Sequence, residues 1–146
     1  MIQINNLTVV EVDEVLVKKI VGKVLKGEGI DKNTEVSIAF IGPGRMRKLN
    51  KTYRKKNRVT DVLSFSNAKV RFEKFKIGPT EKMEGLGEIV ICSREVAKNA
   101  KKDNSVLEQE LTRVIIHGIL HLLGYDHEKT EAEAKKMETK EEQYLK

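Results

Sequence analysis

Residues 105–127 read SVLEQELTRVIIHGILHLLGYDH, and this segment carries the main structural signal of the chain. A helix over 105–123 would be apolar on almost every side from Val114 onward, so we predict that it is buried at the centre of the fold. Ser105 and Glu108 have the spacing of a capping box, which favours a helix start at this point. Gly124 suits the position just beyond the last turn, where a left-handed residue commonly ends a helix.

All three histidines of the chain lie in this segment, at His117, His121 and His127. A spacing of four residues puts His117 and His121 on one helix face, with Cβ atoms roughly 5–6 Å apart. Gly124 then turns the chain, so His127 can approach the same point from another side. Three neutral imidazoles with a fourth position left for water form the layout of a catalytic zinc site, where the pKa of the water falls toward ~7. We therefore predict one Zn²⁺ ion, although imidazole also suits nickel, copper or iron.

Other interpretations of the histidines stay open at this point. They could be ordinary core or surface residues, although the spacing H-x₃-H-x₂-G-x₂-H on one helix disfavours that. A purely structural ion usually has a fourth protein ligand, and Cys92, the only thiol, is distant in sequence. Metzincin peptidases share the spacing but carry a glutamate after the first histidine as general base. Here that position is Gly118, so the sequence supports the ligand geometry and not peptide cleavage.

Weaker patterns predict the rest of the fold. We expect strands over 2–7, 35–41, 60–65 and 87–92, a turn at 42–44, and further helices over 12–25, 45–53, 94–102 and 130–145. Strands and helices do not alternate regularly, so the prediction is an α+β fold, with a small mixed sheet packed against helices. A chain of 146 residues is typical of one domain, here 1–146. The polar, basic stretch 67–84 is expected to be an exposed loop or irregular hairpin.

The overall charge bears on partners and location. A net charge of +6 and a pI of about 9.3 favour polyanions such as nucleic acid or an acidic membrane surface, or reflect only a modest surplus of lysine on a soluble protein. No stretch approaches the ~18 consecutive apolar residues of a membrane span. The first residues lack the basic and apolar regions of a signal peptide. We therefore expect a cytoplasmic protein with no membrane association.

A basic segment between residues 45 and 58 contains no acidic residue. On a helix, Arg47, Lys51 and Arg54 would share a stripe opposite a face formed by Met46, Leu49 and Tyr53. Such a stripe can pair with successive phosphates of a nucleic acid, or can simply be a solvated helix face. The basic residues are Arg45, Arg47, Lys48, Lys51, Arg54, Lys55, Lys56 and Arg58.

Two acidic residues near predicted strands have open roles. Asp61 could orient a ligand or a phosphate-binding arginine, or could be a turn or cap residue. Glu88 begins an otherwise apolar strand and could support the metal site from outside or act as a base, or could simply emerge at the edge of the strand.

Four sequence blocks together resemble one known family. The histidine block 117–127 resembles the signature of the YbeY endoribonucleases, which are bacterial rRNA maturation factors. The blocks LNKTYR at 49–54, TDVLSF at 60–65 and LGEIVI at 86–91 resemble further elements of the same family, in the same order. Glu88 stands where the family more commonly has aspartate.

The resemblance implies a metal in a cleft and cleavage of single-stranded RNA. It also implies a role in maturing the 3′ end of small-subunit rRNA and in ribosome quality control, with the ribosome or its assembly factors as partners. It identifies His117, His121 and His127 as zinc ligands and Arg54 as the functional basic residue of the cleft.

The resulting hypothesis is metal-assisted hydrolysis of phosphodiesters. Arg54 would bind the scissile phosphate, while Arg47, Lys51 and their neighbours would guide the strand. The general base stays open between hydroxide at the ion, Glu88, Asp61 and the 2′-hydroxyl of the RNA. The alternatives are a peptidase-like hydrolase on the same three histidines, or a non-catalytic RNA- or ribosome-binding factor whose metal is structural.

Overall fold

The structure is a computed structural model that describes residues 2–66 and 85–146. Its elements follow in the order β1 (Ile2–Asn6), α1 (Glu14–Gly27), β2 (Glu35–Phe40), α2 (Pro43–Arg54), β3 (Val62–Ser66), β4 (Gly85–Ile91), α3 (Ser93–Lys102), α4 (Leu107–Leu122) and α5 (Glu131–Leu145). These elements confirm the predicted α+β class with a mixed sheet. The predicted loop at 67–84 lies outside the described residues.

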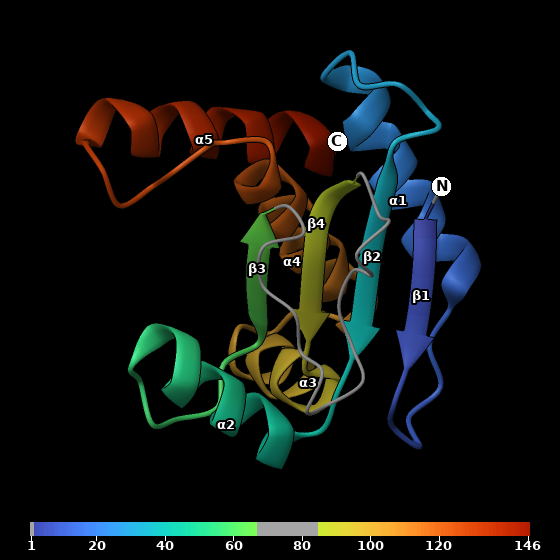
Figure 1. The fold of residues 1–146 in the computed structure, drawn as a ribbon, viewed down its shortest axis with the longest axis vertical. Coiled ribbons are helices and arrows are strands. Elements are labelled where there is room, and N and C mark those ends of the chain that lie inside the picture. The colour runs from blue at the N-terminus through green and yellow to red at the C-terminus, as the bar shows by residue number, and fades with distance from the viewer. Residues whose placement is uncertain (1, 67–84) are drawn as a thin grey trace.

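The sheet has the strand order β1-β2-β4-β3. β1, β2 and β4 run parallel, and β3 pairs antiparallel with β4. Figure 1 shows α1 and α4 behind the sheet, with α2 at the lower end of β3 and α5 across the top. In this strand order β3 is an edge strand. It contacts α4, which carries His117 and His121, and its Leu63 lies in one hydrophobic cluster with residues of the basic helix α2.

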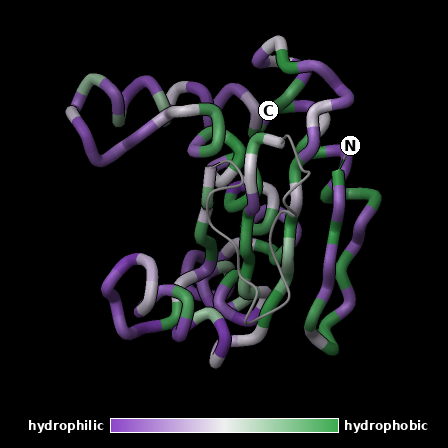
Figure 2. The backbone as a smooth tube through the Cα atoms, in the orientation of Figure 1, coloured by the Kyte–Doolittle hydropathy of each residue, from purple (hydrophilic) through white to green (hydrophobic). Residues whose placement is uncertain are grey.

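The two faces of the sheet belong to different hydrophobic clusters. On one face, Ile38, Phe40 and Ile89 pack with α1 and α4 in the larger hydrophobic cluster. On the other face, Leu63 and Val90 pack with Met46 and Leu49 of α2 in the smaller cluster. The central strands are mostly hydrophobic and α5 is mostly hydrophilic, as the colours of Figure 2 show. Within the described residues, no helix is both long and apolar enough to cross a bilayer.

The central helix α4 has the predicted burial and end but not the predicted start. Ile115, Ile119 and Leu120 are fully buried. Gly124 has a φ of +100°, the left-handed conformation expected just beyond the helix end. The predicted capping box is wrong, because Val106 is the N-cap and no side chain caps the helix. The Ser105 hydroxyl instead donates to the Gln109 side chain at 3.1 Å and lies 3.4 Å from the Val106 carbonyl.

The basic helix α2 begins earlier than predicted. The expected turn over 42–44 is wrong, since Pro43 is already the first helical residue. Proline favours this position because its fixed φ suits a helix and its missing N–H has no partner to lose there. Met46 and Leu49 are fully buried as predicted, but Tyr53 is 38% exposed and lies at the rim, edge-on to the Phe65 ring.

Candidate metal centre

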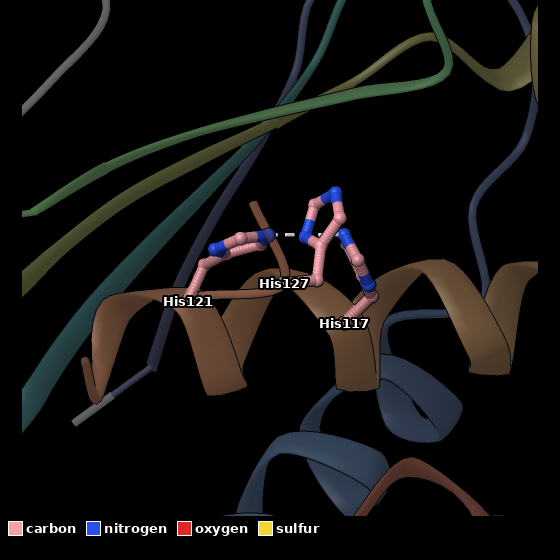
Figure 3. Close-up of side chains that lie close together, drawn as sticks. All are labelled: His117, His121 and His127. Atoms are coloured by element: carbon pink, nitrogen blue, oxygen red, sulfur yellow. Dashed lines mark hydrogen bonds between the residues drawn. The ribbon is translucent and has the colours of Figure 1, made fainter. Parts of the chain in front are cut away.

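Two successive turns of α4 carry the first two histidines of the group. His117 and His121 rise from the same side of this helix, and the ring of His127 lies beside them (Figure 3). The Nε2 atoms of His117 and His121 are 3.1 Å apart. The ring centroids of the three histidines lie 4.6, 5.2 and 5.0 Å from one another. One ligand nitrogen from each ring falls within 4.8 Å of the others, so the three residues could hold one metal ion.

A short turn after α4 brings His127 to the other two histidines. The backbone N–H of Tyr125 donates to the carbonyl of Leu120, which closes the end of the helix. The carboxylate of Asp126 accepts from the backbone N–H of Glu128 at 2.8 Å and orders the turn around His127. Tyr125 and Asp126 thus both form hydrogen bonds within the segment that carries His127.

The surroundings of His121 favour the neutral form of its ring. Burial lowers the pKa of His121, and the charges of His117 and His127 lower it further. Asp126 and a backbone hydrogen bond with Tyr125 act in the opposite direction without reversing the shift. A neutral imidazole is the form that binds metal ions, so His121 is suited to be a ligand near neutral pH.

The donor set fits a transition-metal ion. Two nitrogens bound at 2.0–2.1 Å in a tetrahedral arrangement lie about 3.3 Å apart, close to the 3.1 Å between the two Nε2 atoms. In residues 2–66 and 85–146, no thiol or carboxylate completes the group as a fourth ligand. Cys92 is fully buried in the smaller cluster beside α2. Among the described residues the group therefore has three protein ligands, the number typical of catalytic zinc sites.

The three histidines open into a cleft of about 630 Å³. Arg54, Lys56 and Arg58 line it on the side of α2 and the segment that follows this helix. The acidic residues that line the cleft are Asp61, Asp126 and Glu128, and Lys129 adds a further positive charge. The cleft thus combines nitrogen ligands for a metal with cationic groups for an anionic ligand.

The side chain of Arg54 is held at the cleft by two contacts. Its Nη2 donates to the carbonyl of Ser64 at 2.9 Å, and its guanidinium lies 5.5 Å from the centroid of the Phe65 ring. A guanidinium has five N–H donors. The contact with Ser64 uses one of them in the described structure, so the group is oriented while donors remain for a ligand.

The other basic residues of the predicted stripe are placed differently. Arg47 donates to the Asn57 side chain at 2.9 Å and does not line the cleft. Lys51 is exposed and also lies outside the cleft lining. Only Arg54 of the three therefore meets the histidines in one site.

The two acidic residues with open roles are separated by the sheet. Asp61 lines the cleft, and its carboxylate is 3.5 Å from the Asn99 amide. Ile89 faces Gly118 of α4, so the preceding residue, Glu88, points to the opposite face of the sheet. Glu88 is 1% exposed, and burial raises its pKa to about 7 against a smaller lowering by Ser37. The interpretation of Glu88 as a base at the histidines is therefore wrong.

Sequence reasoning missed two acidic residues that contact this region. Glu141 of α5 lies 2.7 Å from Nδ1 of His117. Glu28, at the end of α1, accepts hydrogen bonds from the hydroxyls of Tyr125 and Tyr144 and from Lys140. Helical spacing could have identified Glu141, because it shares a stripe of α5 with the buried residues Met137 and Tyr144. No local pattern could have identified Glu28, because its partners are 97 to 116 residues away.

Replacing Glu28 with glutamine is expected to lower the free energy of unfolding by about 1–3 kcal/mol at neutral pH. Burial raises the pKa of Glu28, but hydrogen bonds from Tyr125, Tyr144 and Lys140 outweigh it and leave the pKa below 4.5. A carboxylate with a lowered folded-state pKa stabilises the fold above its unfolded pKa, and this contribution is lost as the pH falls through the folded pKa.

Urea unfolding at a series of pH values measures this difference. The gap between wild type and Glu28→Gln should be largest at neutral pH and should shrink below about pH 4.5. Glu138→Gln, at an exposed position of α5, is the matched control and should change little. A gap that stays constant with pH would contradict this role of the carboxylate.

Comparison with known proteins places the chain in a family. The family model described as endoribonuclease YbeY matches residues 3–146. A relative from Thermoanaerobacter pseudethanolicus named "Endoribonuclease YbeY" is 38% identical over 136 residues, which are 90% of this chain and 85% of the relative. One of the same name from Thermodesulfovibrio yellowstonii is 44% identical over 110 residues, which cover 75% of this chain and 64% of that relative.

A solved structure agrees with the sequence matches. The solution structure of a Thermotoga maritima protein matches with a TM-score of 0.64 and 32% identity, covering 99% of this chain and 87% of that one. The match to an Aquifex aeolicus relative, also named "Endoribonuclease YbeY", spans 63% of that relative's length. With the family model matching nearly the whole chain, this protein belongs to the YbeY endoribonuclease family.

Proposed function

We propose that residues 1–146 form one metallo-endoribonuclease domain, which cleaves single-stranded RNA in the cytoplasm. Its substrate would be the 3′ region of small-subunit rRNA, with the ribosome or its assembly factors as partners in maturation and quality control. One observation carries the proposal. Three histidine nitrogens lie within 4.8 Å of one another, and the histidines line the same cleft as Arg54, Lys56 and Arg58. The names of the relatives and the family model support the same activity.

In this proposal, His117, His121 and His127 hold one Zn²⁺ ion. When bound, the ion supplies Lewis-acid chemistry for hydrolysis of a phosphodiester. The imidazole donor set suits zinc among other transition metals. Since the three rings are neutral donors, they would not themselves offset the positive charge of a bound ion, and this charge would favour an anionic substrate.

Arg54 is proposed to bind the scissile phosphate. The contacts with Ser64 and Phe65 fix its guanidinium before the substrate arrives, so little side-chain entropy is lost on binding. Negative charge grows on the phosphate in the transition state, and a pre-oriented cation stabilises that state more than the ground state. Lys56 and Arg58 would hold the flanking strand through its phosphates.

A peptidase is not favoured by the geometry of α4. A Cβ on Gly118 would lie 3.1 Å from Ile89 and 3.3 Å from the Ser64 hydroxyl. Position 118 therefore faces the sheet, and a glutamate there would not point toward the cleft. The general base of the peptidase motif has no counterpart at this position.

The test is cleavage of a labelled single-stranded RNA by the purified protein, with chelator and after Zn²⁺ is restored. We expect cleavage to disappear with chelator and to return with the ion. Loss of cleavage with retained RNA binding supports the enzyme. Metal-loaded protein that binds the RNA without cutting it would overturn the enzyme and favour the non-catalytic binding factor.

Arg54→Ala is expected to reduce cleavage by about 100-fold, the typical effect of removing one group that stabilises transition-state charge. Metal content and unfolding midpoint should stay near those of the wild type, because Arg54 is exposed and lies outside the histidine group. Arg45→Ala is the matched control. It removes the same charge from α2 about 13 Å further along the helix, outside the cleft lining.

The two arginine variants separate local chemistry from general electrostatics. Each loses one positive charge, so any effect on long-range attraction of RNA should be similar and should weaken with salt. Equal loss of activity in both variants would remove Arg54 from the proposed phosphate role.

A further inference from the structure

The contact between His117 and Glu141 joins two parts of the chain. Nδ1 of His117 lies 2.7 Å from Oε1 of Glu141, across 24 residues of sequence. Both side chains are largely shielded, with 30% and 22% of their surfaces exposed. The other nitrogen of the same ring, Nε2, faces His121 at 3.1 Å. One nitrogen of His117 thus meets a carboxylate while the other faces the proposed ion.

Glu141 occupies an unusual position on its helix. Met137 and Tyr144, four residues before it and three after it, are 1% and 4% exposed. These spacings put all three residues on one stripe of α5, the stripe that packs against the rest of the fold. A carboxylate in the middle of an inward-facing stripe needs a polar partner, because burial of an unpaired charge is costly. His117 is the partner that the structure gives it.

The carboxylate decides which ring nitrogen carries the proton. A neutral imidazole has one N–H and one lone pair. An ionised carboxylate only accepts hydrogen bonds, so the proton of the neutral ring belongs on Nδ1, beside Glu141. The lone pair then lies on Nε2, which faces His121 and the shared ligand point. The ring is held in the tautomer and orientation that a metal ligand requires.

We propose that Glu141 is a positioning residue of the metal centre, which fixes the tautomer of His117 and makes α5 part of the site. This inference rests on the proposed metal binding by the three histidines. The hydrogen-bonded carboxylate also makes the ring a stronger donor and offsets part of the charge of a divalent ion. Loss of such a partner typically weakens metal binding by about 10–100-fold.

α5 is held in place independently of Glu141. Tyr144 and Lys140 bind the carboxylate of Glu28 on α1, and Met137 lies in the larger hydrophobic cluster. Because these contacts stay when Glu141 is changed, a variant at this position should keep its fold. The effect on the metal can therefore be measured apart from the effect on the helix.

The experiment is a Zn²⁺ titration in competition with a chelator of known affinity, on the full chain. Glu141→Gln keeps the shape and an acceptor but removes the charge, and Glu141→Ala removes both. We expect Zn²⁺ affinity to fall about 10–100-fold in Glu141→Ala and by less in Glu141→Gln. Glu142→Gln makes the same charge change at the next, exposed position and should bind Zn²⁺ as the wild type does.

Nitrogen NMR of the histidine rings gives a second readout without any metal. In wild type, neutral His117 should carry its proton on Nδ1, and Glu141→Ala should shift it toward the mixture of tautomers found in free histidine. Unchanged affinity in Glu141→Ala, an equal loss in Glu142→Gln, or a proton on Nε2 in the wild type would each overturn the role of Glu141. Failure of the wild type to bind Zn²⁺ would instead overturn the metal centre itself, so the two failures are distinguishable.

Discussion

Replacing His121 with alanine is expected to abolish binding of the metal and, with it, cleavage of RNA. His121 contacts both other histidines, with its Nε2 3.1 Å from that of His117 and its ring centroid 5.0 Å from that of His127. Two remaining imidazoles on different segments cannot hold a divalent ion at an open three-ligand site with comparable affinity. We expect the bound Zn²⁺ per chain to fall from one to near zero, and cleavage to fall below detection.

Thermal unfolding with and without Zn²⁺ separates loss of the ion from loss of the fold. An ion that binds only the folded state at 100 times its Kd stabilises that state by about 2.7 kcal/mol. Added Zn²⁺ should therefore raise the unfolding midpoint of the wild type and leave that of His121→Ala unchanged. Wild type with chelator should unfold near the midpoint of the variant.

His121→Gln is a useful companion, because it keeps much of the volume of the ring and a polar end but is a poor ligand. If it also loses the ion while remaining folded, the loss is one of coordination and not of packing. A wild-type midpoint that is insensitive to both chelator and Zn²⁺ would contradict the metal centre. Cleavage by the alanine variant at the wild-type rate would contradict the enzymatic role of the site.

Replacing Gly118 with glutamate is expected to destabilise the protein by about 4 kcal/mol or more, a size reached only when a change disrupts the core. Gly118 is buried where α4 crosses β3 and β4. A Cβ there would meet Ile89 at 3.1 and 3.2 Å and the Ser64 hydroxyl at 3.3 Å, and the Gly118 carbonyl accepts a hydrogen bond from the same hydroxyl. A glutamate would add overpacking and a buried carboxylate without a partner.

Two glycine-to-alanine variants provide matched controls for this prediction. Gly118→Ala adds only the Cβ, so we expect a smaller loss of about 1–2 kcal/mol from overpacking. Gly22→Ala, within α1, has no heavy atom within 4 Å of the added Cβ. It should stabilise the protein by about 0.5–1 kcal/mol through helix propensity.

Urea unfolding of the metal-free proteins measures all three variants on one scale. A Gly118→Glu variant as stable as the wild type would mean that the side chain has escaped into the cleft. That result would contradict the inference that a glutamate at position 118 cannot point toward the cleft.

Much of the candidate site follows from residues that are close in sequence. The common face of His117 and His121 depends only on helical spacing, and the end of α4 depends on Gly124 adopting a positive φ of +100°. The start of α5 also has a local cause, since the Thr130 side chain accepts from the backbone N–H of Glu133. The apolar character of α4 predicts its central place, because such a helix is stable only when it is covered.

Local sequence patterns gave wrong predictions for the starts of α4 and α2. Ser105 and Glu108 have the spacing of a capping box, but the Ser105 hydroxyl contacts the Gln109 side chain and the Val106 carbonyl, and no side chain caps the helix. Pro43 appeared to mark a turn, although its fixed φ also suits the first position of a helix. The sequence pattern is compatible with either outcome in each case.

The grouping of the three histidines, the central helix and the family could all be predicted from the sequence, because they depend on spacing within a turn or two and on blocks of consecutive residues. The packing of distant elements was needed to show that Arg54 reaches the cleft while Arg47 binds Asn57, and that Glu88 lies across the sheet from the histidines. It was also needed to show that Glu141 meets His117 across 24 residues. Each of these contacts depends on strand order, on which face of a strand a residue occupies, or on how two distant helices pack, and no local spacing along the chain encodes those relations.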